Sequence, residues 1–147
     1  FNDVDLTVED VSEVCAKLGD DGVVGILPTV ITANVDRMCQ CLSIIAASRD
    51  SDPLVRELVT GVHIEGPFIN ETPGYVGAHP VDAVRPANGD MMRRLTDAAG
   101  GLTRIVTLAP ERDPGFGVTR WLAEQGIVVA AGHLCCYESD RGHVYPG

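Results

Sequence analysis

The sequence is poor in lysine, in aromatic side chains and in long apolar runs. Lys17 is the single lysine among 11 basic residues, which stand against 21 acidic ones and leave a net charge of −10. Such a charge repels phosphate backbones and anionic lipids, so neither nucleic acid nor a membrane surface is expected as a partner. No apolar run approaches the ~20 residues that a membrane-spanning helix requires.

The chain also lacks an initiator methionine, a basic start and a signal-like N-terminus. Secretion is therefore not indicated, and a cytoplasmic location is expected. Its 147 residues, 45% of them hydrophobic, suffice for one ordinary folded domain.

The five cysteines are an odd number without a signal peptide, which fits reduced thiols better than a disulfide framework. Cys39 and Cys41 lie two residues apart in a helical pattern and so face different sides of the helix. This favours buried or helix-surface thiols over a metal site. The adjacent Cys135 and Cys136 are interpreted in the same way, with redox chemistry as the alternative.

Helical and strand-like patterns alternate four times along the chain. Helices are expected to begin after capping residues, namely Thr7, Asn34, Asn88 and Asp113, the last with Pro114 in its first turn. Strands are expected in four mainly apolar runs, at residues 23–31, 58–65, 104–109 and 127–131. The alternation predicts an α/β fold of βα units on a parallel sheet. A loop rich in glycine and proline is expected from Gly66 to about Gly89.

Polar residues that could carry chemistry lie at or just beyond the ends of three of the expected strands: Glu65, Glu111 and His133. In parallel sheets the functional groups lie at the carboxyl ends of the strands. A carboxylate and an imidazole at one edge could share zinc or a similar ion, which would lower the pKa of bound water to about 7. Equally, Glu65 could be a salt-bridge or turn residue, and His133 could cap a loop.

Two other histidines have weaker claims. Strand alternation directs His63 to the same side as Glu65, which favours a filler of the barrel interior or a supporting group over a metal ligand. His79 is a polar residue in the long loop, with no further signal of its own.

Four motifs in order resemble those of N-acetylglucosamine-6-phosphate deacetylases, a family of metal-dependent amidohydrolases. They are GVHIEGPFIN at 61–70, GAHP at 77–80, TLAPE at 107–111 and AGH at 131–133. The segment GILPT at 25–29 is similar to the family's second barrel strand. The resemblance spans roughly residues 5–133 and implies that residues 1–133 form a partial (β/α)8 TIM barrel of the amidohydrolase type, with about four βα units. Residues 134–147 form a tail that does not match the family.

The resemblance also implies the chemistry: hydrolysis of the N-acetyl group of an amino-sugar phosphate. Glu65 and His133 match the ligands of the catalytic divalent metal, with zinc expected and iron, manganese or cobalt as alternatives. Ala78 and His79 match contacts to the sugar phosphate. Full-length members are expected to form homo-oligomers.

The departures from the family pattern concern catalysis. The further metal-binding histidine and the general-base aspartate of the family have no counterpart, so no catalytic residue is assigned. His143 follows too closely behind His133 to replace that histidine, and Val76 stands where the family has a basic residue. The isolated chain is therefore expected to be inactive. A half-barrel without catalysis and a different amidohydrolase remain alternatives, as does galactosamine in place of glucosamine.

Overall fold

The structure, a computed structural model, describes residues 1–135. In this part of the chain a parallel sheet has four strands in chain order: β1 (Thr29–Ile31), β2 (Val62–Glu65), β3 (Thr103–Leu108) and β4 (Val128–Ala131). All three pairings are parallel. The expected α/β fold on a parallel sheet is therefore confirmed. Among the described helices, none is long and apolar enough to cross a membrane.

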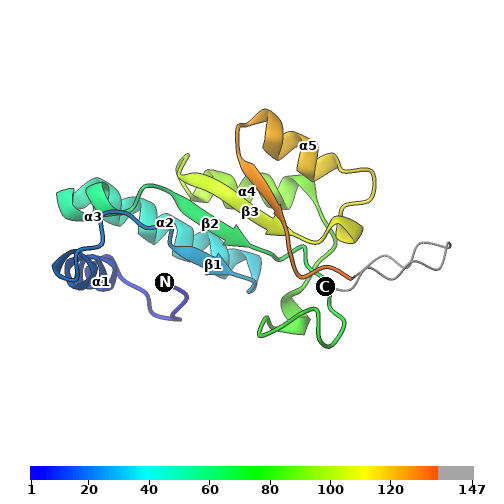
Figure 1. The fold of residues 1–147 in the computed structure, drawn as a ribbon, viewed down its shortest axis with the longest axis horizontal. Helices are drawn as coiled ribbons and strands as arrows, with labels where there is room; N and C mark the ends of the chain where they lie inside the picture. Colours follow the sequence, from blue (N-terminus) through cyan, green and yellow to red (C-terminus); the bar gives the residue numbers. More distant parts are fainter. Residues whose placement is uncertain (136–147) are drawn as a thin grey trace.

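The helices that connect the strands cover the sheet on one face, and the first helix, which precedes the sheet in the chain, packs against two of these helices (Figure 1). The helices are α1 (Val8–Asp20), α2 (Val35–Ser51), α3 (Pro53–Leu58), α4 (Gly89–Ala98) and α5 (Gly117–Glu124), with short 3-10 turns η1 (Val81–Ala83) and η2 (Pro110–Arg112). Thr7, Asn34 and Asn88 accept hydrogen bonds from the first-turn N–H groups of α1, α2 and α4. These three caps confirm the helix starts expected from the sequence.

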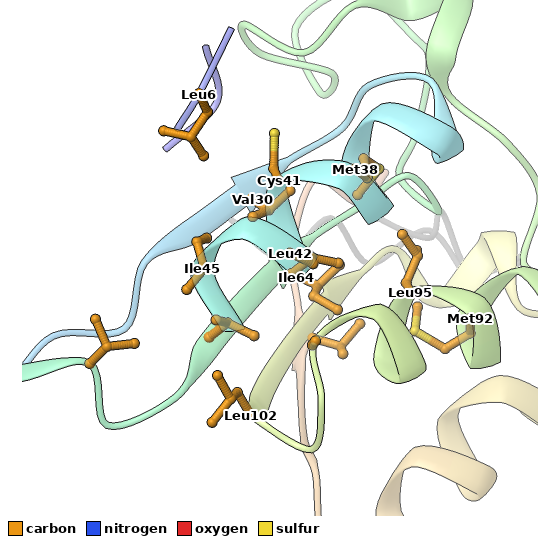
Figure 2. Packing of buried hydrophobic residues seen from close by; sticks show 14 of the residues in the cluster. Leu6, Val30, Met38, Cys41, Leu42, Ile45, Ile64, Met92, Leu95 and Leu102 are labelled. Atoms are coloured by element: carbon orange, nitrogen blue, oxygen red, sulfur yellow. The ribbon is translucent and has the colours of Figure 1, made fainter. Parts of the chain in front are cut away.

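The core lies between this face of the sheet and helices α2 and α4 (Figure 2). Leu42 and Ile45 of α2 pack over the sheet, and Leu95 of α4 lies beside them; all three are fully buried. The register places Val30, Ile64 and Val106 in one row beneath them. Each such side chain contributes about 1.5–3 kcal/mol through burial. Because side chains alternate along a strand, this packing directs the neighbouring residues to the opposite face.

That opposite face carries two rows of side chains across the sheet. One row contains Thr29, His63, Ile105 and Val128, and the next contains Ile31, Glu65, Thr107 and Ala130. Several of these side chains are only partly covered by the described residues, and Val128 is 60% exposed. The second row lies along the carboxyl edge of the sheet, and Glu65 is therefore at that edge.

Two of the expected strands are shorter than predicted. The run at 23–31 pairs only at Ile26 and in β1, and Val24 is 90% exposed. Pro28 has no N–H to offer a ladder, which interrupts the strand. The start predicted for the strand at 58–65 was wrong, because Leu58 is the last residue of helix α3 and β2 begins at Val62. Asp52 caps α3, and Pro53 lies in its first turn.

The start of the last helix was also predicted wrongly. Helix α5 begins at Gly117, after Phe116, whose φ of 56° is left-handed, and Pro114 lies outside it. Asp113 nevertheless caps the helix from a distance, because its carboxylate accepts hydrogen bonds from the N–H groups of Val118 (3.2 Å) and Thr119 (2.8 Å). The expectations for the tail beyond residue 135, including Cys136 and His143, lie outside the described residues.

Candidate functional site

Three side chains that could bind a metal meet at the carboxyl edge of the sheet. They are Glu65, His79 and His133, and their potential ligand atoms all lie within 4.8 Å of one another. Glu65 is the last residue of β2, His133 follows β4, and His79 belongs to the long loop after β2. Figure 1 shows this loop beside the end of β4. The structure thus brings together the two residues expected from the sequence as metal ligands, and adds His79, expected as a substrate contact.

Strand ends and close packing deliver Glu65 and His133 to the same place. Strands β2 and β4 flank β3 in the same direction, so both end at one edge. The Gly132 N–H donates to the carbonyl of Leu108 (3.1 Å), which ties the turn after β4 to β3. A Cβ at Gly132 would lie 2.6 Å from Cγ2 of Thr107. Only glycine allows this approach, which sets the position of His133.

The side chains of Glu65 and His133 lie close enough to share a proton or one cation. His133 Nε2 lies 2.9 Å from Glu65 Oε1, and His133 Nδ1 lies 2.9 Å from the carbonyl oxygen of Tyr75. A carbonyl can only accept, so Nδ1 carries the hydrogen and, in the neutral ring, Nε2 presents a lone pair to the carboxylate. Two acceptors at this distance require a proton or a cation between them. Metal-binding histidines typically donate their other N–H in this way.

His79 is the most deeply buried member of the cluster, at 8% exposure. Its Nε2 lies 3.6 Å from Glu65 Oε1, and its ring meets that of His133 edge-on at 4.5 Å between centroids. Burial lowers the pKa of His79, the neighbouring His133 lowers it further, and Glu65 opposes both. Its Nδ1 is buried without a hydrogen-bond partner among the described residues. This environment favours the neutral imidazole, which is the form that donates to a metal or accepts from a substrate.

His63 lies outside this cluster, in agreement with the sequence interpretation. Its ring is held between two hydroxyl groups, with Nδ1 3.2 Å from Thr29 Oγ1 and Nε2 2.8 Å from Thr107 Oγ1. Burial lowers the pKa of His63, and Glu65 opposes the shift. His63 therefore supports the face of the sheet beneath Glu65.

The other residues singled out from the sequence occupy ordinary positions. Ala78 is exposed next to His79, and its contact with substrate stays a prediction. Cys41 is buried in α2, and Cys39 is half-buried with its Sγ 3.8 Å from the carbonyl oxygen of Arg94. Both are free thiols of a helix, as expected from their spacing.

Sequence reasoning missed the role of Asn70 and gave none to Glu111. The Asn70 N–H donates to the carbonyl of His133 (2.9 Å), and the Glu111 carboxylate accepts from Asn70 Nδ2 (2.8 Å) and from the Cys135 N–H (2.6 Å). Burial raises the pKa of Glu111, but these hydrogen bonds outweigh it, so the net shift is downward. The only signal in the sequence was the position of Glu111 just beyond a strand end.

Comparison with known proteins identifies sugar-phosphate deacetylases as relatives. No family model matches the chain. It is 36% identical over 121 residues to the N-acetylglucosamine-6-phosphate deacetylase of Bacillus subtilis (strain 168), a match that covers 80% of this chain and 30% of that protein. The Bos taurus protein of the same name is 34% identical over 125 residues, covering 84% and 30%. The N-acetylgalactosamine-6-phosphate deacetylase of Escherichia coli O157:H7 is 30% identical over 131 residues, covering 86% and 34%.

Solved structures agree with these relatives. The crystal structure of N-acetyl-D-glucosamine-6-phosphate deacetylase from Mycobacterium smegmatis superposes with a TM-score of 0.74 and 27% identity, covering 86% of this chain and 32% of that one. The Pasteurella multocida enzyme, at 22% identity and a TM-score of 0.71, supports the fold. The chain spans about 30% of the length of the curated relatives. In sequence and in fold the chain is similar to one segment of the N-acetylglucosamine-6-phosphate deacetylases.

Proposed function

We propose that this chain supplies the metal-binding part of an N-acetylglucosamine-6-phosphate deacetylase, which hydrolyses the acetamide to glucosamine 6-phosphate and acetate. The observation that carries the proposal is the cluster of Glu65, His79 and His133 at the carboxyl edge of the sheet. It occurs in a chain 36% identical over 121 residues to a deacetylase of this name. The relatives named above are all sugar-phosphate deacetylases, which disfavours a different amidohydrolase.

The sheet is proposed to be part of a (β/α)8 barrel. Helices cover one face, and the other face presents rows of side chains of the kind that fill a barrel interior. Val128, in one of these rows, is 60% exposed among the described residues. A complete barrel needs about 250 residues, and this chain aligns with about 30% of its relatives. The remaining strands would come from sequence that aligns with the rest of those proteins.

The donor set fits a divalent metal, with zinc as the proposed ion. A carboxylate oxygen and an imidazole nitrogen, which Glu65 and His133 offer, are both ligands of hydrolytic zinc sites. Glu65 and His133 would hold the ion, and Tyr75 fixes the His133 tautomer through Nδ1. A bound metal would polarise the substrate carbonyl and lower the pKa of water. His79, buried beside them, is assigned to the substrate, and Ala78 to the same loop surface.

A segment exchange tests the proposal in a complete barrel. The part of the Bacillus subtilis deacetylase that aligns with this chain is replaced by the corresponding residues of the chain, and acetate release from N-acetylglucosamine 6-phosphate is measured. We expect acetate release by this chimera and a loss of roughly 100-fold or more in its Glu65→Gln variant, because a neutral amide is a much weaker ligand for a divalent metal than a carboxylate. The exposed Glu57→Gln is the matched control and should retain activity.

A folded chimera, checked by its thermal melt, that releases no acetate would contradict the proposal. The isolated chain is expected to release none, because its described metal cluster has Glu65 as its one carboxylate and offers no second one to accept a proton. Acetate release by the isolated chain would overturn that expectation.

Galactosamine is the second candidate sugar. It is favoured by the 30% identity over 131 residues to the Escherichia coli O157:H7 N-acetylgalactosamine-6-phosphate deacetylase. Comparing kcat/KM of the chimera for the two sugar phosphates decides between them.

The role of His79 is tested separately. His79→Ala is expected to raise KM if His79 contacts the substrate, and to weaken zinc binding if it is a ligand.

A further inference from the structure

His133 has a backbone conformation that needs support from its neighbours. Its φ is 50°, in the left-handed region that residues other than glycine rarely adopt. The cost of this conformation is about 1–2 kcal/mol. Such a residue keeps its conformation only where the surrounding contacts fix it. The contacts on either side of His133 therefore determine where its imidazole lies.

Two hydrogen bonds hold the chain on both sides of this residue. The Asn70 N–H donates to the carbonyl of His133 at 2.9 Å. Two residues further on, the Cys135 N–H donates to Glu111 Oε1 at 2.6 Å. The first bond comes from the loop after β2 and the second from the turn after β3. The backbone that carries His133 is thus hydrogen-bonded to the segments that follow β2 and β3.

The two supporting residues are also bonded to each other. Asn70 Nδ2 donates to Glu111 Oε1 at 2.8 Å, and Asn70 Oδ1 accepts from the Thr72 N–H at 2.8 Å. Asn70 is 8% exposed, so its amide is held in one orientation by buried contacts. A backbone bond from the Ala109 N–H to the Phe68 carbonyl (2.8 Å) joins the same two loops. Asn70 and Glu111 therefore act as one unit.

The hydrogen bonds of Glu111 with Asn70 and Cys135 need an acceptor oxygen and not its charge. Both bonds end on the same atom, Oε1. The adjacent Arg112 pairs with Glu71 at 2.5 Å. A glutamine could keep both bonds through its single carbonyl oxygen, whereas alanine would lose them.

We propose that Asn70 and Glu111 are positioning residues that hold His133 in its left-handed conformation and direct its Nε2 toward Glu65. Both lie outside the Glu65–His79–His133 cluster. The consequence for zinc rests on the metal site proposed above. The orientation of the His133 ring does not, because it can be observed in the chain without metal.

Zinc affinity of the isolated chain, measured by competition with a chromophoric chelator, is the first test. Glu111→Ala and Asn70→Ala should each weaken zinc binding by about 10–100-fold, as is usual for groups that support a metal-binding histidine. Glu111→Gln should stay within about threefold of the wild type. The double alanine variant should be little weaker than the single ones, because both remove the same bond. Asp113→Asn, which weakens the cap of α5 in the same loop, should lower Tm without changing zinc affinity.

The second test follows the His133 ring by NMR in the metal-free chain. The wild type and Glu111→Gln should show one set of His133 ring resonances, with a hydrogen on Nδ1 as the Tyr75 carbonyl requires, and the two alanine variants should show a mixture of ring environments. If Glu111→Ala does not fold, Asn70→Ala, which keeps its backbone bond to His133, makes the same comparison. Alanine variants that lower Tm but change neither zinc affinity nor the ring spectrum would overturn the proposal. Equal losses in Glu111→Gln and Glu111→Ala would overturn it too, by indicating a role for the charge. A wild type that binds no zinc would refute the metal site, and the ring spectrum would still decide the positioning role.

Discussion

Replacing Gly132 by alanine is expected to destabilise the fold and displace His133. The added Cβ would lie 2.6 Å from Thr107 Cγ2, whereas ordinary contacts begin at 3.4 Å. Thr107 cannot easily yield, because it is 7% exposed and its hydroxyl is bonded to His63 Nε2 at 2.8 Å. The φ of Gly132 lies outside the left-handed region, so alanine meets a steric penalty and no backbone penalty.

The size of the effect follows from this overlap. Overpacking at a tight contact costs about 1–3 kcal/mol, which corresponds to a fall in Tm of roughly 3–10 °C for a domain of this size. Urea unfolding followed by circular dichroism gives the free energy of unfolding. The same variant should bind zinc more weakly, because His133 is the next residue.

A second substitution tests whether the overlap is the cause. Thr107→Ser removes the Cγ2 methyl and keeps the hydroxyl that contacts His63. The Gly132→Ala/Thr107→Ser chain should recover about 1 kcal/mol or more relative to the sum of the single effects. The reasoning would be refuted by a Gly132→Ala chain as stable as the wild type, or by strictly additive effects in the double variant.

Two further predictions concern the fold. Leu42→Ala, at a fully buried position of α2, should lower the free energy of unfolding by about 2–5 kcal/mol. The control Val24→Ala, at a position 90% exposed, should change this free energy by no more than about 0.5 kcal/mol. Equal effects of the two substitutions would contradict the core described here. The side-chain and backbone hydrogen bonds from Thr7 lower the pKa of Asp10, so their stabilisation is present at neutral pH and is lost as the pH falls through this lowered pKa. Asp10→Asn should therefore show a smaller loss of unfolding free energy than the wild type between about pH 7 and pH 3, and an unchanged loss in urea titrations would count against it.

Much of the fold could be predicted because its signals are local. Thr7, Asn34 and Asn88 cap helices through side-chain contacts within three residues, so sequence pattern alone reveals them. The meeting of Glu65 and His133 followed from one general property, that parallel strands end at a common edge. Neither prediction needed any knowledge of loop conformation.

The remaining features depend on contacts between distant segments. His79 lies in a loop without periodicity, and it reaches the cluster because that loop folds back, with the Tyr75 carbonyl against His133 and the Arg85 N–H bonded to Pro67. Asp113 caps α5 across a turn that includes the left-handed Phe116, which the sequence does not indicate. Helix α3 was different, because the Asp52–Pro53 start signal was present and was outweighed by the apolar residues that follow.

Zinc titration of the isolated, metal-free chain tests the central claim, that Glu65 and His133 form a metal site. Isothermal titration calorimetry should show one zinc ion bound per chain in the wild type and in the Glu57→Gln control. Glu65→Gln and His133→Ala should each weaken binding by at least about 10-fold, because each removes a donor from a small ligand set. Zinc binding that neither substitution affects, or a wild type that binds no zinc at all, would contradict the account.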